Sequence, residues 1–288
     1  MKISNEDKEF LELYSDSEYE KPSATVDAVI FRLIDKKENN YRKLPQKKLQ
    51  VYLSKRKYSP FKNVYGVIGT FIDLKEELEQ TMKLCVKNKV GLNNFYSEQL
   101  YTFGDKGRDP RTRVLSVSYM LLTDENENLE NGEWFDIDIS SSSEKELSEN
   151  GYTISKNIEL KLSNASCELK NKLNVSIKKN NLTETKKIET ISTNLAFDHL
   201  KLIYFAIERL KNKLEYTDII FNLLPKTFTL TELKFSYETI LGEKLLDANF
   251  RRKTAKLVKP TEEFSTGRGH RNSLLYTKNT DYSNIQLD

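Results

Sequence analysis

The sequence is poor in residues that form disulfides or bind transition metals, with two cysteines and two histidines among 288 residues. Cys85 and Cys167 are too few and too widely spaced for a disulfide framework or a zinc site. His199 and His270 do not add a ligand cluster to them. We therefore predict no metal site and no cofactor.

Long apolar runs are also missing. No stretch approaches the roughly 18 consecutive apolar residues of a membrane-spanning helix. Residues 1–22 contain seven acidic residues and three lysines, without the apolar core of a signal peptide. We expect a cytoplasmic protein that makes no membrane contact.

The composition is polar for a folded protein, with 38% hydrophobic and 31% charged residues. Part of the chain should therefore lie in solvated segments. A length of 288 residues predicts two domains. The net charge of +3 says little about partners, so the distribution of charge along the chain is more informative.

The first half of the chain alternates strands with one helix. The helix carries Leu78, Met82 and Val86 at helical spacing, begins near Leu74 and stops at Gly91. This alternation predicts an α/β domain with a mixed sheet. The predicted elements are strands at 25–34, 49–54, 114–122 and 133–139, a basic loop at 41–48, a glycine-containing turn at 65–71 and the helix at 74–89.

Residues 140–192 differ from the rest, because a serine run (140–143) opens a segment rich in Lys, Asn, Glu, Ser and Thr. Polar and apolar residues alternate at 158–162 and 173–177, which predicts a hairpin that extends the sheet, with flexible ends. We interpret the segment as a solvated insertion.

After residue 195 the apolar residues recur with the spacing of a helix. An apolar stripe runs from Leu200 to Leu214, a short helix is predicted at 218–224, and Thr229 with Glu232 forms a possible capping box for a third helix ending at Gly242. A fourth helix is predicted at 247–257, followed by strands at 258–264 and 273–277 around a Gly-Arg-Gly turn. This order of elements is typical of a winged helix.

Residues 249–271 carry seven Lys or Arg against two acids, a patch suited to DNA phosphates. If Phe250 and Leu257 face the core, the residues on the opposite face form one ridge that can reach base edges in the major groove. The basic residues next to this ridge are better placed to contact phosphates. The residues at the tip of the predicted wing are placed to contact the minor groove or the DNA backbone. The alternative is an ordinary solvated helix face. The ridge comprises Asn249, Arg252 and Lys256, its neighbours are Arg251 and Lys253, and the wing tip carries Arg268, His270 and Arg271.

A second arginine cluster lies in the first half. Arg108, Arg111 and Arg113 stand beside Asp105 and Asp109, and guanidinium groups suit phosphate ligands. The cluster predicts either a clamp for an anionic ligand or a surface loop held by salt bridges. We expect Arg56, at the end of the second strand, to face the same cleft.

The segment from Gly69 to Leu92 resembles a Nudix box whose carboxylates have been lost. Aligned on Gly91 and Leu92, the first Glu of the box is Glu76, but the Arg-Glu pair becomes Leu84 and Cys85, and the Glu-Glu pair becomes Asn88 and Lys89. In Nudix hydrolases these carboxylates hold Mg²⁺ against a pyrophosphate. The resemblance therefore implies an inactive hydrolase homologue.

Three further segments resemble the NrtR-like transcriptional regulators: 99–118, 195–199 (Leu-Ala-Phe-Asp-His) and 249–253 (Asn-Phe-Arg-Arg-Lys). The family joins a Nudix-like α/β/α sensor, which usually binds ADP-ribose or in some branches a sugar, to a winged helix that represses transcription as a dimer. The resemblance covers about residues 25–136 and 194–278, and it implies a sensor domain at 23–193 and a linker helix with winged helix at 194–288. The acidic segment at 1–22 and the insertion at 140–192 lie outside it.

Three hypotheses follow. The first is a ligand-responsive repressor, a homodimer on a palindromic operator, whose effector is ADP-ribose, a sugar or a sugar phosphate. The second is a divergent Nudix hydrolase acting on ADP-ribose or another nucleoside diphosphate derivative, with carboxylates such as Glu76 and Glu79. The third is a constitutive DNA-binding protein whose sensor is only a dimerisation scaffold.

Overall fold

The fold was analysed in a computed structural model, which describes residues 4–15, 20–36, 46–125, 129–148, 150–180, 182–265 and 272–281. Its helices are α1 (Asn5–Leu13), α2 (Leu78–Val90), α3 (His199–Tyr216), the 3₁₀ helix η2 (Ile219–Leu223), α4 (Leu230–Leu241) and α5 (Asp247–Thr254). Its strands are β1 (Ser23–Asp35), β2 (Lys47–Lys55), β3 (Tyr65–Gly66), β4 (Ile68–Phe71), β5 (Tyr96–Phe103), β6 (Val114–Leu122), β7 (Glu133–Ser148), β8 (Gly151–Ser163), β9 (Glu168–Asn180), β10 (Glu184–Ser192), β11 (Val258–Phe264) and β12 (Leu274–Lys278).

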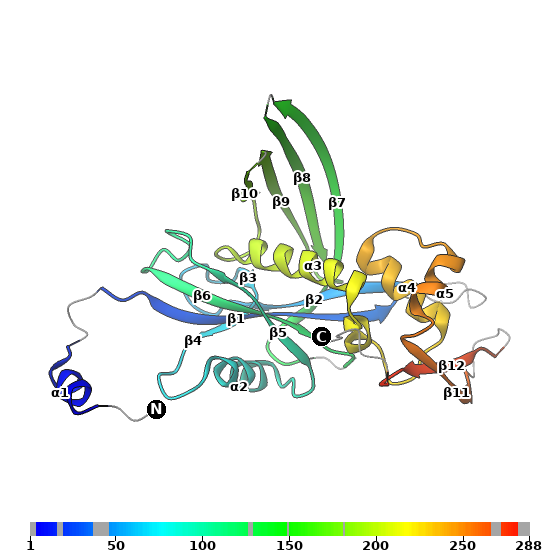
Figure 1. The fold of residues 1–288 in the computed structure, drawn as a ribbon, viewed down its shortest axis with the longest axis horizontal. Helices are drawn as coiled ribbons and strands as arrows, with labels where there is room; N and C mark the ends of the chain where they lie inside the picture. Colours follow the sequence, from blue (N-terminus) through cyan, green and yellow to red (C-terminus); the bar gives the residue numbers. More distant parts are fainter. Residues whose placement is uncertain are drawn as a thin grey trace.

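A mixed sheet forms the centre, with α2 on one face and α3 on the other (Figure 1). The strand order is β10-β9-β8-β7-β2-β1-β6-β5, in which β1 and β6 are parallel, while β3 pairs with β2 and β4 with β1. Alternate residues of β1 serve the two faces: Val26, Ala28 and Ile30 pack toward α2, whereas Val29 and Phe31 belong to the core that includes α3. The predicted α/β/α sandwich is confirmed.

The helix α2 is shorter than predicted at its start. It begins at Leu78, because the backbone at Asp73 to Glu76 turns back on itself and the Asp73 side chain accepts the N–H of Lys75. Leu74 is fully exposed rather than on the buried face. The end is as predicted, since Gly91 adopts a left-handed conformation with φ 76° and its N–H caps the Lys87 carbonyl.

Two further predictions need correction. The segment 65–71 is not a turn but forms the short strands β3 and β4. The first pairs with the end of β2, and the second pairs with the first half of β1. The serine run 140–143 is not a flexible end, because it lies within β7 and pairs with 156–159 of β8. The backbone hydrogen bonds between β7 and β8 stabilise this strand, although its serine side chains bury little apolar surface.

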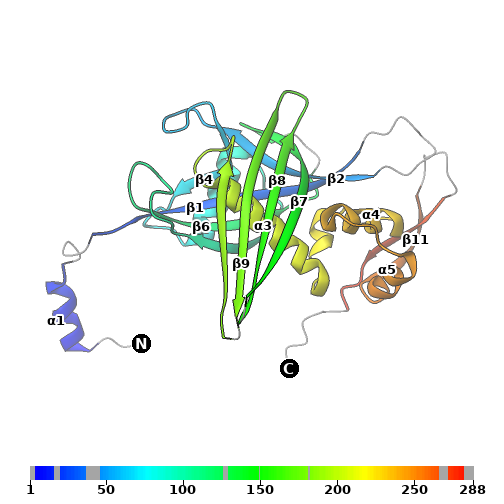
Figure 2. The same cartoon turned by 90° about the horizontal axis from the view of Figure 1, so that it is seen from above.

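The segment 140–192 belongs to an antiparallel arm, β7 to β10, that rises from the sheet beside α3 (Figures 1 and 2). The predicted hairpin is present, with Ile158 opposite Leu173 in the β8–β9 pair. These two residues and Leu160 and Leu162 are buried in the core that includes α3, whereas the outer half of β7 is exposed. The base of the arm therefore contributes to the core and only its outer part is solvated.

The C-terminal elements follow the predicted order. The α4 capping box is present, with Thr229 and Glu232 each bonding the backbone of the other, and Gly242 ends the helix. Phe228, Leu233 and Phe250 belong to the same core cluster as Phe31 of β1, and Thr239 Oγ1 donates to the Lys47 carbonyl at 3.2 Å. The winged-helix elements and the sheet thus share one core.

Some predictions fall outside the described residues, namely most of the basic loop at 41–48 and the Gly-Arg-Gly turn between β11 and β12. Within the described ranges, no helix combines the length and apolar character that crossing a membrane requires.

Candidate ligand cavity and nucleic-acid interface

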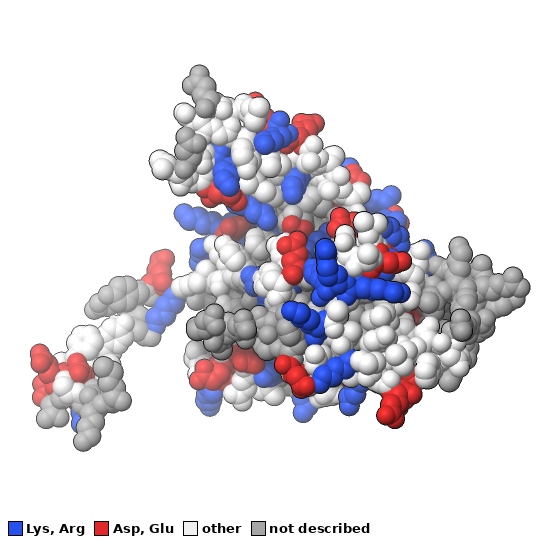
Figure 3. All heavy atoms as spheres, turned by 45° about the vertical axis from the view of Figure 1, so that its right-hand side comes forward, with Lys and Arg blue, Asp and Glu red and all other residues white. Residues whose placement is uncertain are grey.

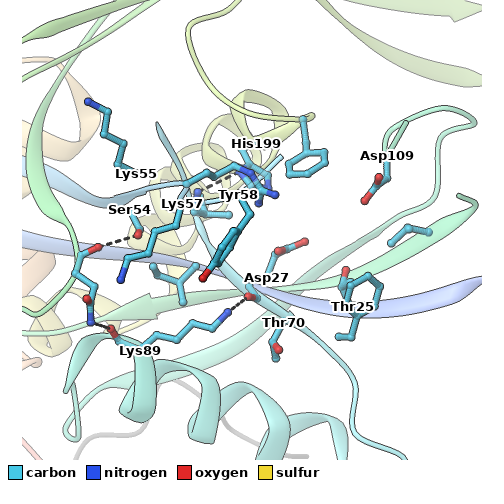
Figure 4. Close-up of a pocket in the computed structure, with 18 of the residues that line it drawn as sticks. Thr25, Asp27, Ser54, Lys55, Lys57, Tyr58, Thr70, Lys89, Asp109 and His199 are labelled. Carbon is cyan, nitrogen blue, oxygen red and sulfur yellow. Dashed lines mark hydrogen bonds between the residues drawn. The ribbon is translucent and has the colours of Figure 1, made fainter. Parts of the chain in front are cut away.

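A cavity of about 530 Å³ opens beside the central sheet. Its walls come from β1, the end of β2, β4, the last turn of α2, the loop after β5 and the start of α3 (Figure 4). The lining residues used below are Asp27, Lys55, Arg56, Lys57, Tyr58, Gly69, Phe71, Asn88, Lys89, Arg108, Asp109, Arg111, Phe197 and His199.

The inner wall is held by buried charges. The Arg108 side chain is 5% exposed and donates to both carboxylate oxygens of Asp198, at 2.9 and 2.7 Å, and lies 3.7 Å from Asp27. Asp27 also accepts the hydroxyl of Ser116. Gly69 lies directly against it, because a Cβ at that position would stand 1.9 Å from Asp27 Oδ1. These contacts join β1, the loop after β5 and the start of α3.

The rim combines arginines with aromatic rings. Arg111 binds Asp109 through two nitrogens, at 3.0 and 2.7 Å, which lowers the pKa of the Asp109 carboxyl. Arg56 lies 4.6 Å from the centre of the Phe197 ring, and Arg111 lies 5.8 Å from it. Desolvation and, secondly, the charge of Arg111 lower the pKa of Arg56. Two cations thus flank one ring, an arrangement that an anionic ligand would stabilise.

His199, the first residue of α3, is buried beneath this rim. Its Nδ1 accepts the N–H of Val67 at 3.1 Å, and a Cβ at Gly66 would stand 2.4 Å from the same nitrogen. Burial lowers the pKa of His199, against the opposite effect of Asp27 and Asp198. The neutral ring therefore carries its proton on Nε2. Phe197, two residues earlier, has φ 52°, a strained conformation typical of functional sites.

The structure separates the predicted ligand-binding arginines. Arg56, Arg108 and Arg111 line the cavity, whereas Arg113 does not. Arg108 and Arg111 already have acidic partners, as the salt-bridged alternative requires, and the clamp for an anionic ligand stays a prediction. Residue-by-residue reasoning missed Asp27 and Phe197. The single acid inside the mostly apolar strand 25–34 was the available signal for Asp27.

The Nudix-box positions lie on or near α2. Glu76 precedes the helix and accepts the Thr81 hydroxyl at 3.0 Å, Leu84 is half-buried, and burial raises the pKa of the Cys85 thiol. Of the positions aligned with the box carboxylates and their neighbours, Asn88 and Lys89 line the cavity whereas Glu76, Leu84 and Cys85 do not, and Lys89 donates to the Gly69 carbonyl. In the described ranges, no group of three or more His, Cys, Asp or Glu is arranged to hold a metal ion.

The helix α5 has one buried and one exposed face. Phe250 and, just after the helix, Leu257 are buried, with the Phe250 ring 5.8 Å from that of Tyr237. Asn249, Arg252 and Lys256 are exposed, and Arg252 donates to the Asn249 side chain at 3.4 Å. These three exposed residues form the predicted ridge, but the helix is shorter than the predicted 247–257: it ends at Thr254, and Lys256 follows it.

The residues flanking this ridge, Arg251 and Lys253, are also exposed. Lys and Arg side chains gather on the side of the molecule that carries α4 and α5 (Figure 3). The predicted wing-tip residues Arg268, His270 and Arg271 lie outside the described residues.

Comparison with known proteins agrees with this architecture. The family model of the NrtR DNA-binding winged helix domain matches residues 220–277. The chain is 27% identical over 279 residues to the ADPR responsive transcriptional repressor NtrR of Acinetobacter baylyi, covering 93% of this chain and 86% of the relative.

Two solved structures extend the likeness to the fold. A MutT/nudix family protein from Enterococcus faecalis superposes with a TM-score of 0.64 at 24% identity, over 95% of this chain and 93% of the other. Shewanella oneidensis NrtR in complex with a 27mer DNA superposes with a TM-score of 0.56 at 26% identity, over 90% of this chain and 94% of the other. The resemblance to NrtR-like regulators, and the combination of a Nudix-like sandwich with a winged helix, are confirmed.

Proposed function

We propose that the chain is an ADP-ribose-responsive transcriptional repressor that binds DNA through α5. The observation that carries this proposal is the exposed ridge of Asn249, Arg252 and Lys256 on the helix of an NrtR-type winged helix. Arginine can bind guanine in a bidentate manner and asparagine can bind adenine, so the ridge suits the major groove. The DNA-bound Shewanella structure, similar over most of the chain, supports duplex DNA as the partner.

The remaining basic residues would position the duplex. Arg251 and Lys253 flank the ridge and suit phosphates, and the wing-tip residues Arg268, His270 and Arg271 are assigned to the backbone or minor groove. We propose a homodimer on a palindromic operator with half-sites about one helical turn apart. The functional units would be residues 23–193 and 194–288, with 1–22 as an acidic extension.

ADP-ribose is the proposed effector, because the Acinetobacter relative is named as ADPR responsive and the cavity is rich in cations and aromatic rings. An effector there would touch Phe197 and His199, at the start of α3. At its other end α3 packs on η2 and α4. A ligand that favours one position of α3 would shift the DNA-binding elements through this shared packing.

The donor set argues against Mg²⁺-dependent hydrolysis. The only carboxylates among the lining residues are Asp27 and Asp109, and each is already bound by an arginine or a hydroxyl. Glu76 and Glu79, which the hydrolase hypothesis needs, are not lining residues, and Glu79 instead pairs with Lys83 at 2.7 Å. Hard divalent cations need several free oxygen ligands, so we propose that the box is inactive.

A binding assay on the protein's own upstream DNA tests the proposal. Fluorescence anisotropy should show specific binding that weakens about 5- to 150-fold in Arg252→Ala, while Lys87→Ala removes an exposed charge from α2 as a control. Added ADP-ribose should release the DNA. Binding without release would indicate the constitutive protein, and turnover of ADP-ribose with Mg²⁺ or Mn²⁺ would indicate the hydrolase.

A further inference from the structure

The last turn of α2 places a positive charge where a Nudix box has a carboxylate. Lys89 lies one helical step from Asn88, and both residues line the cavity. The Lys89 ammonium donates to the carbonyl of Gly69, and its own carbonyl accepts the Asn131 amide at 2.9 Å. Figure 4 shows Lys89 extending from α2 toward the strand that carries Asp27. One contact therefore holds the ammonium at the cavity wall, and the other holds the backbone of Lys89.

The rest of the cavity adds to this charge. Six Lys or Arg line it against two acids, and Asp198 behind the wall pairs with Arg108, which leaves an excess of three positive charges. Lys57 and Tyr58 enter from the side opposite Lys89 (Figure 4). Asp27 and Asp109 are already occupied by Ser116 and Arg111. The cations that line the cavity therefore outnumber the acidic groups that line it. This excess favours a ligand with more than one negative charge.

In a Nudix hydrolase, a divalent ion neutralises the bridging diphosphate. Here the same helix offers an amide at 88 and an ammonium at 89, and an ammonium repels a divalent cation. The donors present do not fit such an ion. The diphosphate of a bound ligand must then be neutralised by the chain itself.

We propose that Lys89 takes the place of the metal ion, so that the cavity binds nucleoside diphosphate esters without any divalent cation. This inference rests on the proposed function, because it assumes that the effector is of the ADP-ribose class. Lys89 would contact the diphosphate directly, with Lys57 on the opposite side of the cavity (Figure 4) and Arg56 among the other lining cations. Divalent ions would be unnecessary for binding and for release of DNA.

Calorimetric titration of the full chain with ADP-ribose tests this inference. The affinity should be equal, within about twofold, in EDTA and in MgCl₂. Lys89→Met should lower it about 10- to 100-fold, the loss expected when a hydrogen bond to a charged group is removed. Lys87→Met is the matched control, because Lys87 is exposed on the same helix and is not a lining residue.

A second ligand separates contact from structural damage. Adenosine lacks the diphosphate, so Lys89→Met should leave its affinity unchanged. A requirement for Mg²⁺ in the natural chain, equal effects of the two substitutions, or an equal loss for adenosine would overturn the role of Lys89 while leaving the effector proposal intact. If ADP-ribose neither bound nor released DNA, the proposed function would fail together with this inference.

Discussion

The cavity and the α5 ridge are both rich in arginine and lysine, but the structure holds the two sets in different ways. In the cavity, Arg108 is 5% exposed and bound at two points to Asp198, and Arg111 is bound at two points to Asp109. Arg251 and Arg252 of α5 and Lys256 just after the helix are exposed, and none forms an ion pair with another described residue. One set is locked within the fold and the other is free to meet a partner.

This difference fits two kinds of recognition. Buried, paired guanidinium groups define a fixed shape, which a small ligand must match. Exposed cations on a helix can adjust to a duplex, and the release of counterions from DNA supplies most of their affinity. Stability should therefore depend on the cavity charges, whereas DNA affinity should depend on the ridge. The following predictions test that contrast.

Breaking the buried ion pair should have the largest effect. Asp198→Ala leaves Arg108 buried without its bidentate partner and should lower the free energy of unfolding by about 3–5 kcal/mol. Urea unfolding followed by circular dichroism measures it. The double substitution Arg108→Leu with Asp198→Leu should recover much of the loss, because no uncompensated charge then remains. A loss of under 0.5 kcal/mol in Asp198→Ala would show that the cavity charges are not locked.

Gly66→Ala should have the next largest effect. The added Cβ would stand 2.4 Å from Nδ1 of His199, whose ring is buried and bonded to the Val67 backbone, so one of them must shift. We expect a loss of about 1–3 kcal/mol in stability from this overpacking, together with weaker effector binding. Thermal unfolding measures the first, and calorimetric titration with ADP-ribose the second. Gly107→Ala measures a different cost, because nothing lies within 4 Å of that Cβ and only the positive φ of 74° opposes alanine there.

The ridge should show the opposite behaviour, with affinity changing and stability unchanged. Arg252→Ala should weaken specific DNA binding by about 1–3 kcal/mol and relax sequence preference at one position. Arg251→Ala should weaken binding to all duplexes alike and reduce the slope of log affinity against log salt by about one. Anisotropy titrations over a salt series distinguish the two. Equal loss of specificity in both variants would contradict the division between base and phosphate contacts.

The smallest expected effect is a pH dependence from His199. Burial lowers its pKa in the folded protein, so below about pH 6.5 the unfolded chain binds a proton that the folded chain refuses. Stability should therefore fall as pH decreases from 6.5, with a slope of at most about 1.4 kcal/mol per unit from this group. The comparison of unfolding for the natural chain and His199→Asn isolates it, because Asp105 and Asp109 contribute equally to both.

Much of the fold was predictable from short-range patterns. The spacing of Leu200 and Leu214 identified α3, Thr229 and Glu232 identified the start of α4, and the bounds of β6 agree with the apolar run at 114–122. The exposed face of α5 followed from the burial of Phe250. In each of these cases the signal lies within one helix or one strand, so the residues that carry it are close in sequence.

Other features depend on partners that are distant in the chain. The serine run at 140–143 becomes a strand because β8 lies beside it, and Arg108 finds Asp198 ninety residues away. Whether an arginine is a free clamp or half of an ion pair is decided by that approach. No pattern of neighbouring residues in the sequence predicts which distant residues will pair.

By itself, the sequence determined the order of the elements, the basic face of α5 and the presence of an amide and an ammonium, Asn88 and Lys89, at the end of the helix before Gly91. Only the tertiary structure decided that Lys89, Arg56 and Phe197 share one cavity at the start of α3, and that Arg113 lies outside it. The physical reason is that periodicity and capping act between neighbours along the chain, whereas a cavity is defined by segments that meet only after the sheet has formed.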